Sequence, residues 1–309
     1  MDRNRFKGIF TALVTPMDEE LEVDPDSLAR LVEHQTACGI HGFYVGGSTG
    51  EGFILTSEER RKVLETVVEA VKGRAVVISH VGSVSTMESM SLARHAEETG
   101  ADAISAVVPF YYKVGLQEIQ EHYTSIMSAS RLPMIVYHYP GATGVQLSLD
   151  FYEEMARNPQ CLGVKFTSMN LFEMQQIRSR CGDDFLIWNG HDEVLAGGLL
   201  LGADGAIGST FNMMPDPFLR MYEVKAAGNW DTVRELQVKT NAVIAHMLDY
   251  DVIPYEKRML YLQGIIANPA ARQPLKRFSA EQQAEIDHFY AISDILSVEK
   301  GRKVYDPKI

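Results

Sequence analysis

The sequence predicts an α/β fold, a parallel (β/α)8 TIM barrel with a C-terminal helical extension. Strand-like and helix-like patterns alternate eight times, about every 30 residues, as in repeated βα units. The strand-like segments are near-continuous apolar runs, which is typical of strands buried on both faces of a sheet. The chain has 309 residues, 46% of them hydrophobic, which is enough for one large core. We expect the barrel over 1–228, with helices over 229–309 packed on it as one structural unit.

Short apolar runs bounded by turn residues mark the predicted strands. They cover 8–16, 42–46, 75–79, 103–108, 133–137, 161–167, 185–188 and 205–208. The helices between them have apolar positions on one face, and two begin with the capping-box pattern of Thr56 with Glu59 and of Ser85 with Glu88. The predicted helices cover 25–37, 56–71, 85–99, 116–129, 148–157, 171–180, 191–201 and 217–227, followed by 231–248, 254–266 and 279–293 in the extension.

The composition and charge of the chain argue against nucleic-acid-binding, membrane-spanning and disulfide-rich classes of protein. The formal net charge is −12, whereas a nucleic-acid-binding protein normally carries a basic patch. No apolar run approaches the roughly 18 residues of a membrane span, and the charged N-terminus has no secretory core, so we expect a cytoplasmic protein. The three cysteines, Cys38, Cys161 and Cys181, are odd in number and lack metal-type spacing, which argues against a disulfide framework.

Lys165 is an ammonium-bearing residue within an apolar strand. Burial lowers the pKa of a lysine and makes available the neutral amine that a Schiff-base nucleophile needs. The alternative is an inert lysine at a strand end with its head group in water. The position of this strand, sixth of eight, favours the first interpretation because barrel active sites lie at the carboxyl ends of the strands.

The sequence GGSTGE at 46–51 follows the second strand. A glycine-rich turn with the hydroxyls of Ser48 and Thr49 offers donors to an anion, here a carboxylate, although an ordinary tight βα turn would have a similar composition. A phosphate site is disfavoured because no P-loop lysine follows.

Aromatic residues follow the fourth and fifth strands. Tyr111 and Tyr137 are phenols that could move a proton during carbonyl chemistry, whereas the simpler interpretation is a lid on the core. His138 is a further acid/base candidate, but it has the opposite strand parity to Tyr137, so only one of the two can point into the barrel.

Polar groups also follow the sixth, seventh and eighth strands. Thr167 shares the face of Lys165, and Asp192 and Glu193 are candidate acceptors for substrate hydroxyls, or else favourable first-turn charges of a helix. Ser209 stands on the same rim. Consecutive side chains at 191–193 would not converge on one ion, so we expect no metal site. A lysine, a neighbouring tyrosine and an anion-binding turn are consistent with a class I aldolase acting on a 2-keto acid.

The motifs GGSTGE at 46–51, YHYP at 137–140 and GVK at 163–165 together resemble the N-acetylneuraminate lyase and dihydrodipicolinate synthase superfamily. The resemblance covers essentially the whole chain. Within the superfamily, Lys165-Phe166-Thr167 is similar to the sialic acid lyases, since the synthases usually carry an acidic residue directly after the lysine. Ala142 stands where the synthases carry an arginine for a second carboxylate.

This resemblance implies a role for each candidate residue. Lys165 would form the Schiff base, Tyr137 would exchange the proton at the reacting hydroxyl, and Ser48 and Thr49 would hold the pyruvate carboxylate, with Ser48 also bonded to Tyr137. Tyr111 resembles a tyrosine that reaches a neighbouring subunit's site. The residues that would line the sugar end are Thr167, Gly190, Asp192, Glu193 and Ser209.

The implied activity is reversible cleavage of N-acetylneuraminate to N-acetylmannosamine and pyruvate, without a metal or organic cofactor, in a homotetramer. Three departures, His138, Tyr139 and His191, stand near the expected pocket and leave the sugar preference open. The alternatives are another 2-keto-3-deoxy sugar acid aldolase or dehydratase, a dihydrodipicolinate synthase-like enzyme, and a non-catalytic 2-keto acid sensor. No nucleic-acid or membrane partner is expected.

Overall fold

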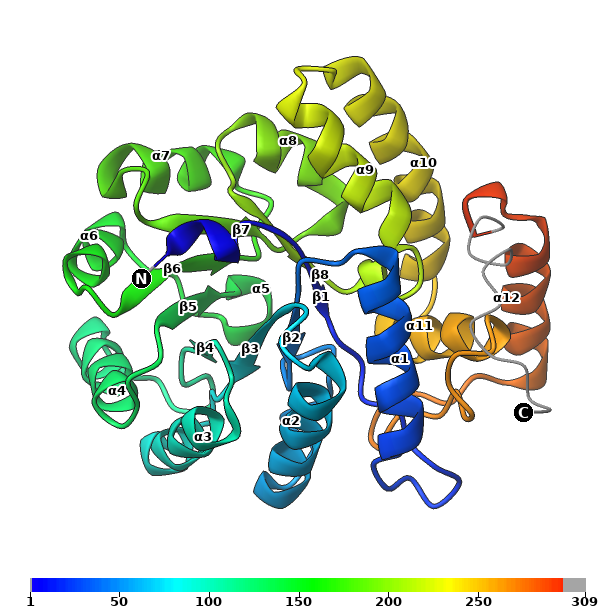
Figure 1. Ribbon diagram of the computed structural model, residues 1–309, viewed down its shortest axis with the longest axis horizontal. Helices are drawn as coiled ribbons and strands as arrows, with labels where there is room; N and C mark the ends of the chain where they lie inside the picture. Colours follow the sequence, from blue (N-terminus) through cyan, green and yellow to red (C-terminus); the bar gives the residue numbers. More distant parts are fainter. Residues whose placement is uncertain (1, 297–309) are drawn as a thin grey trace. The chain divides into compact units, whose positions relative to one another are not determined.

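The computed structural model describes residues 2–296, and it confirms the predicted fold class. Eight strands form a closed barrel in sequence order, and every pair from β2 to β8 is parallel (Figure 1). Their bounds are β1 Gly8–Ala12, β2 Gly42–Val45, β3 Val76–His80, β4 Ala103–Val107, β5 Met134–His138, β6 Cys161–Phe166, β7 Leu186–Asn189 and β8 Gly205–Gly208. Nearly every strand residue is buried, as the unbroken apolar runs predicted.

Helices follow the strands at the predicted places. The α-helices are α1 Pro25–Cys38, α2 Ser57–Val71, α3 Thr86–Thr99, α4 Leu116–Ser128, α5 Pro140–Thr143, α6 Leu149–Arg157, α7 Leu171–Cys181, α8 Leu195–Leu200, α9 Pro215–Ala226, α10 Trp230–Leu248, α11 Val252–Leu262 and α12 Ala280–Ile292. Three 3-10 turns, η1 Arg3–Phe6, η2 Asp192–Val194 and η3 Thr210–Asn212, complete the described elements.

Some sequence predictions were wrong in detail. The single helix predicted over 191–201 is divided into η2 and α8, because Val194 leaves the helical conformation with φ −124° and ψ 20°. The helix predicted to reach residue 266 ends at Leu262. Apolar periodicity cannot detect pieces as short as η1, α5 and η3, which contain four residues or fewer.

Of the two predicted capping boxes, the one at the start of α2 is confirmed. Thr56 and Glu59 exchange both hydrogen bonds there. At the start of α3, the Ser85 side chain accepts from the Glu88 N–H, but the Glu88 carboxylate accepts from the Ser83 hydroxyl instead. The second box is therefore only half formed, because the Ser83 hydroxyl also accepts the Ser85 N–H that would complete it.

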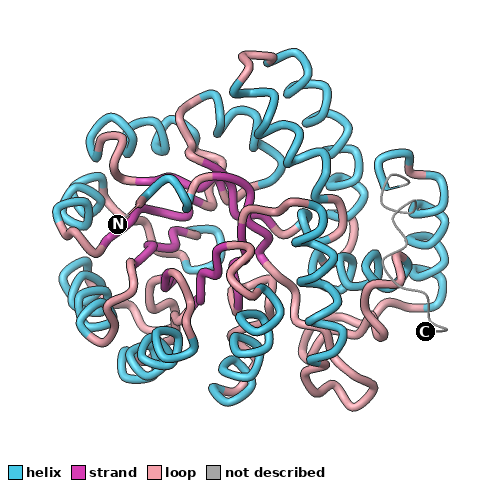
Figure 2. The backbone as a smooth tube through the Cα atoms, in the orientation of Figure 1, coloured by secondary structure: helices cyan, strands magenta, loops and turns pink. Residues whose placement is uncertain are grey.

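The chain divides into two compact units, which are described separately. The first comprises residues up to Phe10, 41–45 and 75–208, and the second comprises 11–40, 46–74 and the residues from Ser209 onward. In the first unit, helices α3, α4, α6 and α7 lie outside the barrel strands (Figure 2). The predicted boundary at 228/229 and the packing of the last helices on the barrel stay predictions, and residues 297–309 lie outside the described residues.

The N-terminal turn η1 covers the amino ends of β6 and β7. Arg3 donates hydrogen bonds to the carbonyls of Leu162 and Asp184, and Phe6 is buried with its carbonyl 2.9 Å from the Trp188 indole nitrogen. In barrels of this kind the active site lies at the opposite end, at the carboxyl ends of the strands.

The second unit is held together by contacts between distant segments. Asn212 donates to the Ala12 carbonyl, and Arg258 of α11 makes two hydrogen bonds with Asp287 of α12. The rings of His246 and Phe289 stack 3.8 Å apart between α10 and α12.

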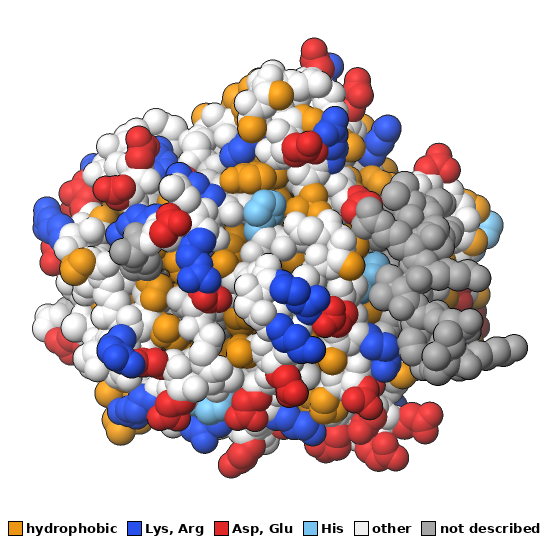
Figure 3. Space-filling view, in the orientation of Figure 1, with side chains coloured by type: hydrophobic (Ala, Val, Ile, Leu, Met, Phe, Trp, Pro, Cys, Tyr) orange, Lys and Arg blue, Asp and Glu red, His pale blue; other side chains and the backbone are white. Residues whose placement is uncertain are grey.

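Among residues 2–296, no helix combines the length and apolar character that a membrane crossing requires. Acidic and basic side chains are interspersed on the face drawn in Figure 3.

Candidate active site

Lys165 is the next-to-last residue of β6 and pairs in register with Tyr137 of β5. Its side chain is only 4% exposed, so the interpretation as a solvated strand-end lysine does not hold. The Lys165 Nζ lies 4.2 Å from the centre of the Tyr137 ring. The structure thus brings together the predicted nucleophile and the predicted proton donor on adjacent strands.

The electrostatic environment of Lys165 favours its neutral form. Burial lowers its pKa to about 7, and the negative charge of Asp192 opposes this effect. With a pKa near 7, about half of the amine is unprotonated at neutral pH, compared with less than a thousandth for an ordinary lysine. A free amine next to a phenol is the combination that imine formation with a ketone requires.

Three residues that the sequence did not single out complete this layer of the barrel. The Tyr44 ring centre lies 4.1 Å from the Lys165 Nζ, and the His80 ring lies 5.9 Å from the rings of both Tyr44 and Tyr137. The Tyr44 hydroxyl donates to Ser105, which in turn donates to the Ile135 carbonyl. Strand position could have identified Tyr44 from the sequence, because Tyr44, like Lys165 and Tyr137, is the next-to-last residue of its strand.

We predict that Asp192→Asn lowers the Lys165 pKa further. The Asp192 carboxylate favours the protonated ammonium, so its removal favours the free amine. The acid limb of imine formation should therefore move to lower pH, as measured by borohydride trapping with pyruvate across pH 5 to 9. An acid limb that stays in place or moves to higher pH would contradict the assignment of Asp192 as the opposing charge.

Thr167 and Gly190 lie against each other beyond the lysine. A Cβ atom on Gly190 would fall 2.0 Å from the Thr167 Oγ1, so only glycine allows this approach. Backbone hydrogen bonds from the two residues to His138 and Phe166 continue the strand pairing. The Thr167 Oγ1 is buried and has no hydrogen-bond partner within residues 2–296. A hydroxyl in this state is suited to bond a bound substrate.

The turn after β7 carries two carboxylates with different surroundings. Asp192 is 5% exposed, whereas Glu193 is partly exposed and lies 3.5 Å from the His191 ring through its Oε2. Burial raises the Glu193 pKa, but hydrogen bonds from His191 and from its own N–H outweigh burial and lower it. Both carboxylates can accept hydrogen bonds from hydroxyl groups. No cluster of three metal-binding side chains occurs in the described part of the chain.

His138 points away from the barrel interior, as its parity required. Its ring stacks on Phe166 at 5.3 Å and meets Tyr152 of α6 edge-on at 6.0 Å, and its Nε2 lies 4.0 Å from Glu173 of α7. Because the ring is sealed between β5 and these helices, it does not reach the Lys165 amine. His138 therefore acts on the scaffold rather than on a substrate.

The buried His138 predicts an acid-sensitive fold. Burial lowers its pKa to about 4, so between about pH 6.5 and 4 the unfolded chain binds a proton that the folded chain does not. Stability falls as the pH drops through this window, and His138 should account for about 2 kcal/mol between pH 7 and 5. The free energy of unfolding, measured with urea at pH 7 and at pH 5, should fall between the two pH values by about 2 kcal/mol less in His138→Phe than in the wild type. An unchanged pH dependence would contradict the burial argument.

The remaining predicted residues lie in other settings. Tyr111 is 76% exposed in the segment between β4 and α4, with its ring 5.1 Å from that of Tyr112. Ser48 and Thr49 belong to the second unit, in the turn directly after β2, and Ser209 directly follows β8. All three of these hydroxyl residues are half-buried. The catalytic and binding roles of these four residues stay predictions.

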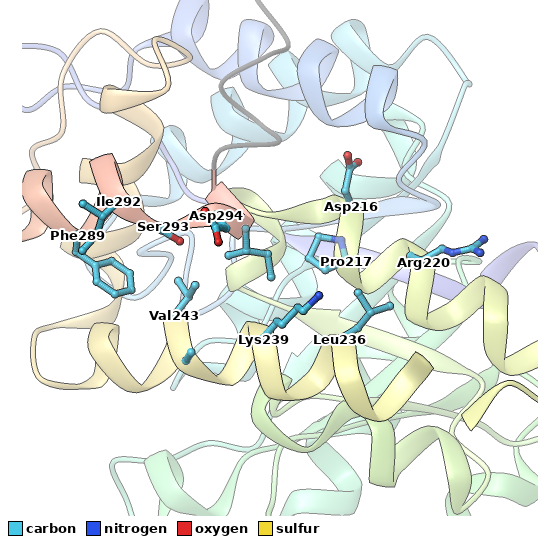
Figure 4. Close-up of a pocket in the computed structure, with 12 residues that line it drawn as sticks. Asp216, Pro217, Arg220, Leu236, Lys239, Val243, Phe289, Ile292, Ser293 and Asp294 are labelled. Carbon is cyan, nitrogen blue, oxygen red and sulfur yellow. The ribbon is translucent and has the colours of Figure 1, made fainter. Parts of the chain in front are cut away.

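A large cavity occurs apart from all of the predicted residues. It has a volume of about 660 Å³ and lies in the second unit, where Leu236, Lys239 and Val243 of α10 face Phe289 and Ile292 of α12 (Figure 4). Its lining is mainly apolar, and it contains none of the candidate catalytic groups.

Known proteins are similar to this chain along nearly its whole length. The model of the Dihydrodipicolinate synthetase family matches residues 5–292. The chain belongs to this family. Among relatives of this family, N-acetylneuraminate lyase 2 of Escherichia coli O6:H1 is 41% identical over 298 residues, covering 96% of each chain. The N-acetylneuraminate lyase of Salmonella agona is 43% identical over 270 residues, covering 87% of this chain and 91% of that one.

Solved structures of the family are similar along nearly the whole chain. The protein CdNal of Clostridium difficile, in complex with mannosamine, gives a TM-score of 0.90 at 35% identity and covers 93% of this chain and 99% of that one. A catalytic lysine mutant of the sialic acid aldolase of Ruminococcus gnavus gives 0.91 at 30% identity, with 96% and 97% covered.

Proposed function

We propose that this protein is a class I aldolase that cleaves N-acetylneuraminate reversibly to N-acetylmannosamine and pyruvate. The observation that carries the proposal is the Lys165 amine, which is buried at the carboxyl end of β6 between the Tyr44 and Tyr137 rings, with its pKa lowered to about 7. Membership of the dihydrodipicolinate synthetase family and the similarity to two N-acetylneuraminate lyases support this choice of reaction.

The chemistry begins at the keto group of the open-chain sugar acid. The neutral Lys165 amine attacks the C2 carbonyl, and loss of water gives a protonated imine. Tyr137, after its phenol proton has passed to solvent, accepts the proton of the C4 hydroxyl as the C3–C4 bond breaks. The electron pair of that bond moves onto the imine to form an enamine, and the aldehyde sugar leaves. Protonation of the enamine at C3 and hydrolysis of the imine release pyruvate and the free lysine.

The two ends of the substrate need separate partners. Ser48 and Thr49 are assigned to the pyruvate carboxylate, because their turn directly follows a barrel strand and presents hydroxyl and N–H donors. The sugar hydroxyls are assigned to Thr167, Gly190, Asp192, Glu193 and Ser209. Two observations support the assignment of the sugar hydroxyls. The Thr167 hydroxyl has no hydrogen-bond partner within residues 2–296, and the Asp192 carboxylate is buried.

Product analysis tests the proposal. Incubation with N-acetylneuraminate should release N-acetylmannosamine and pyruvate in equal amounts, measured by chromatography and by lactate dehydrogenase coupling. Turnover of a different 2-keto-3-deoxy sugar acid, without N-acetylmannosamine from sialic acid, would favour the related aldolases and dehydratases. Imine formation without any turnover would favour a 2-keto acid sensor.

A dihydrodipicolinate synthase-like reaction is the main alternative within the family. Structures of such synthases also resemble the chain, one of them with a TM-score of 0.88 at 27% identity. Ala142, in the short helix α5 after β5, offers no charge for the second carboxylate that such a substrate carries.

We also infer a cytoplasmic homotetramer in which Tyr111 acts across an interface. Its 76% exposure supports that role.

A further inference from the structure

The turn at 46–52 contains the proposed carboxylate site and has a fixed backbone. The Glu51 N–H donates to the Ser48 carbonyl at 3.0 Å, and the Gly52 N–H donates to the Gly47 carbonyl at 3.1 Å. The residues on either side of the Ser48-Thr49 pair are buried, whereas these two are half-buried. The turn therefore presents only its two hydroxyl residues to a ligand.

Two further contacts leave this backbone little freedom. The buried Thr15 hydroxyl donates to the Gly50 carbonyl at 2.8 Å. A Cβ on Gly52 would lie 2.0 Å from the Gly46 carbonyl oxygen, so the two ends of the turn touch. Glu51 has a φ of 61°, in the left-handed region that non-glycine residues rarely adopt. A residue persists in that conformation when its surroundings hold it there.

The Glu51 side chain is held by the C-terminal part of the chain. Its carboxylate forms an ion pair with Lys257 of α11, and both side chains are completely buried. The same carboxylate accepts the Arg272 N–H at 2.7 Å, and the Lys257 ammonium also donates to the Ala270 carbonyl at 3.1 Å. Burial lowers the Lys257 pKa and the charge of Glu51 opposes this effect, so the ammonium form of Lys257 is favoured by Glu51.

We propose that the Glu51–Lys257 ion pair positions the 46–52 turn for the carboxylate of the keto acid. It holds Glu51 in its left-handed conformation, and this fixes the directions of the Ser48 and Thr49 donors. This inference rests on the proposed function and names two positioning residues for it. Its consequence is selectivity: the ion pair should control how strongly the enzyme prefers a free 2-keto acid to the corresponding ester.

The test compares borohydride trapping of pyruvate with that of methyl pyruvate, which keeps the ketone and lacks the charge. The variants are Glu51→Gln, Lys257→Met and the two combined. The double variant leaves no unpaired buried charge, so it retains folding when a single variant does not. Arg258→Met is the matched control, because it removes an ion pair from the same helix, directed at Asp287. Thermal unfolding shows which variants are folded.

The ion-pair variants should need about tenfold more pyruvate for half-maximal trapping, with the ester changed less than about twofold, since a charge-assisted contact is lost for one compound only. The control should retain both values. A folded double variant with the wild-type preference, or an equal loss for both compounds, would overturn the inference. Absence of trapping in the wild type would instead overturn the proposed function.

Discussion

Replacing Lys165 with alanine should abolish turnover, with a fall in kcat/KM of about 10⁴-fold or more. The side chains that lie against the Lys165 Nζ within residues 2–296 include the rings of Tyr44 and Tyr137, and neither carries an amine that could form the imine in its place. About half of the Lys165 amine is already neutral at pH 7, so the fold does not depend on its positive charge. The fold should therefore persist, and steady-state kinetics with N-acetylneuraminate measures the effect.

The control for this variant is Lys62→Ala, which removes an exposed lysine from α2. It should retain wild-type rates. Residual turnover of Lys165→Ala above about one hundredth of the wild-type rate would mean that the imine forms elsewhere or that the reaction does not use one. Circular dichroism on both variants separates loss of chemistry from loss of structure.

Replacing Tyr137 with phenylalanine should slow carbon–carbon cleavage by about 10²- to 10⁴-fold while imine formation continues. The ring remains, so its contact with the Lys165 Nζ at 4.2 Å is preserved and only the hydroxyl is lost. Trapping with pyruvate and turnover of N-acetylneuraminate, measured on the same sample, separate the two steps.

Tyr139→Phe is the matched control, because the Tyr139 ring stacks on the Tyr137 ring at 6.0 Å, whereas Tyr139 itself lies two residues beyond Tyr137, the register partner of Lys165. It should retain cleavage. If Tyr137→Phe lost trapping and cleavage equally, the hydroxyl would act in forming the imine, and the division of roles between Lys165 and Tyr137 would be wrong.

The barrel could be predicted because its signals are local. A strand buried on both faces has to be apolar throughout, and β8 occupies the predicted residues 205–208. The helix predicted at 191–201 failed because apolar spacing does not reveal a change from a 3-10 turn to an α-helix at Val194. The competition between Ser83 and Ser85 around Glu88 depends on a folded loop, which a four-residue motif does not describe.

The site was predictable where strand position and parity determine it. Lys165 and Tyr137 face the same interior, and His138 faces the helices, as their positions required. Tyr44 and His80 were missed because an aromatic or a histidine in a strand is ordinary core composition. Only the folded barrel shows that the Tyr44 ring lies against the Lys165 Nζ and that the His80 ring lies next to Tyr44. The Glu51–Lys257 pair joins residues far apart in sequence, and no local motif links them.

Borohydride reduction in the presence of pyruvate, followed by peptide mass analysis, tests the central claim most directly. We expect one reduced pyruvate adduct on the peptide that carries Lys165, and its yield should follow the titration of a group with a pKa of about 7. An adduct on another lysine, or no adduct at all, would contradict the assignment of Lys165 as the Schiff-base nucleophile.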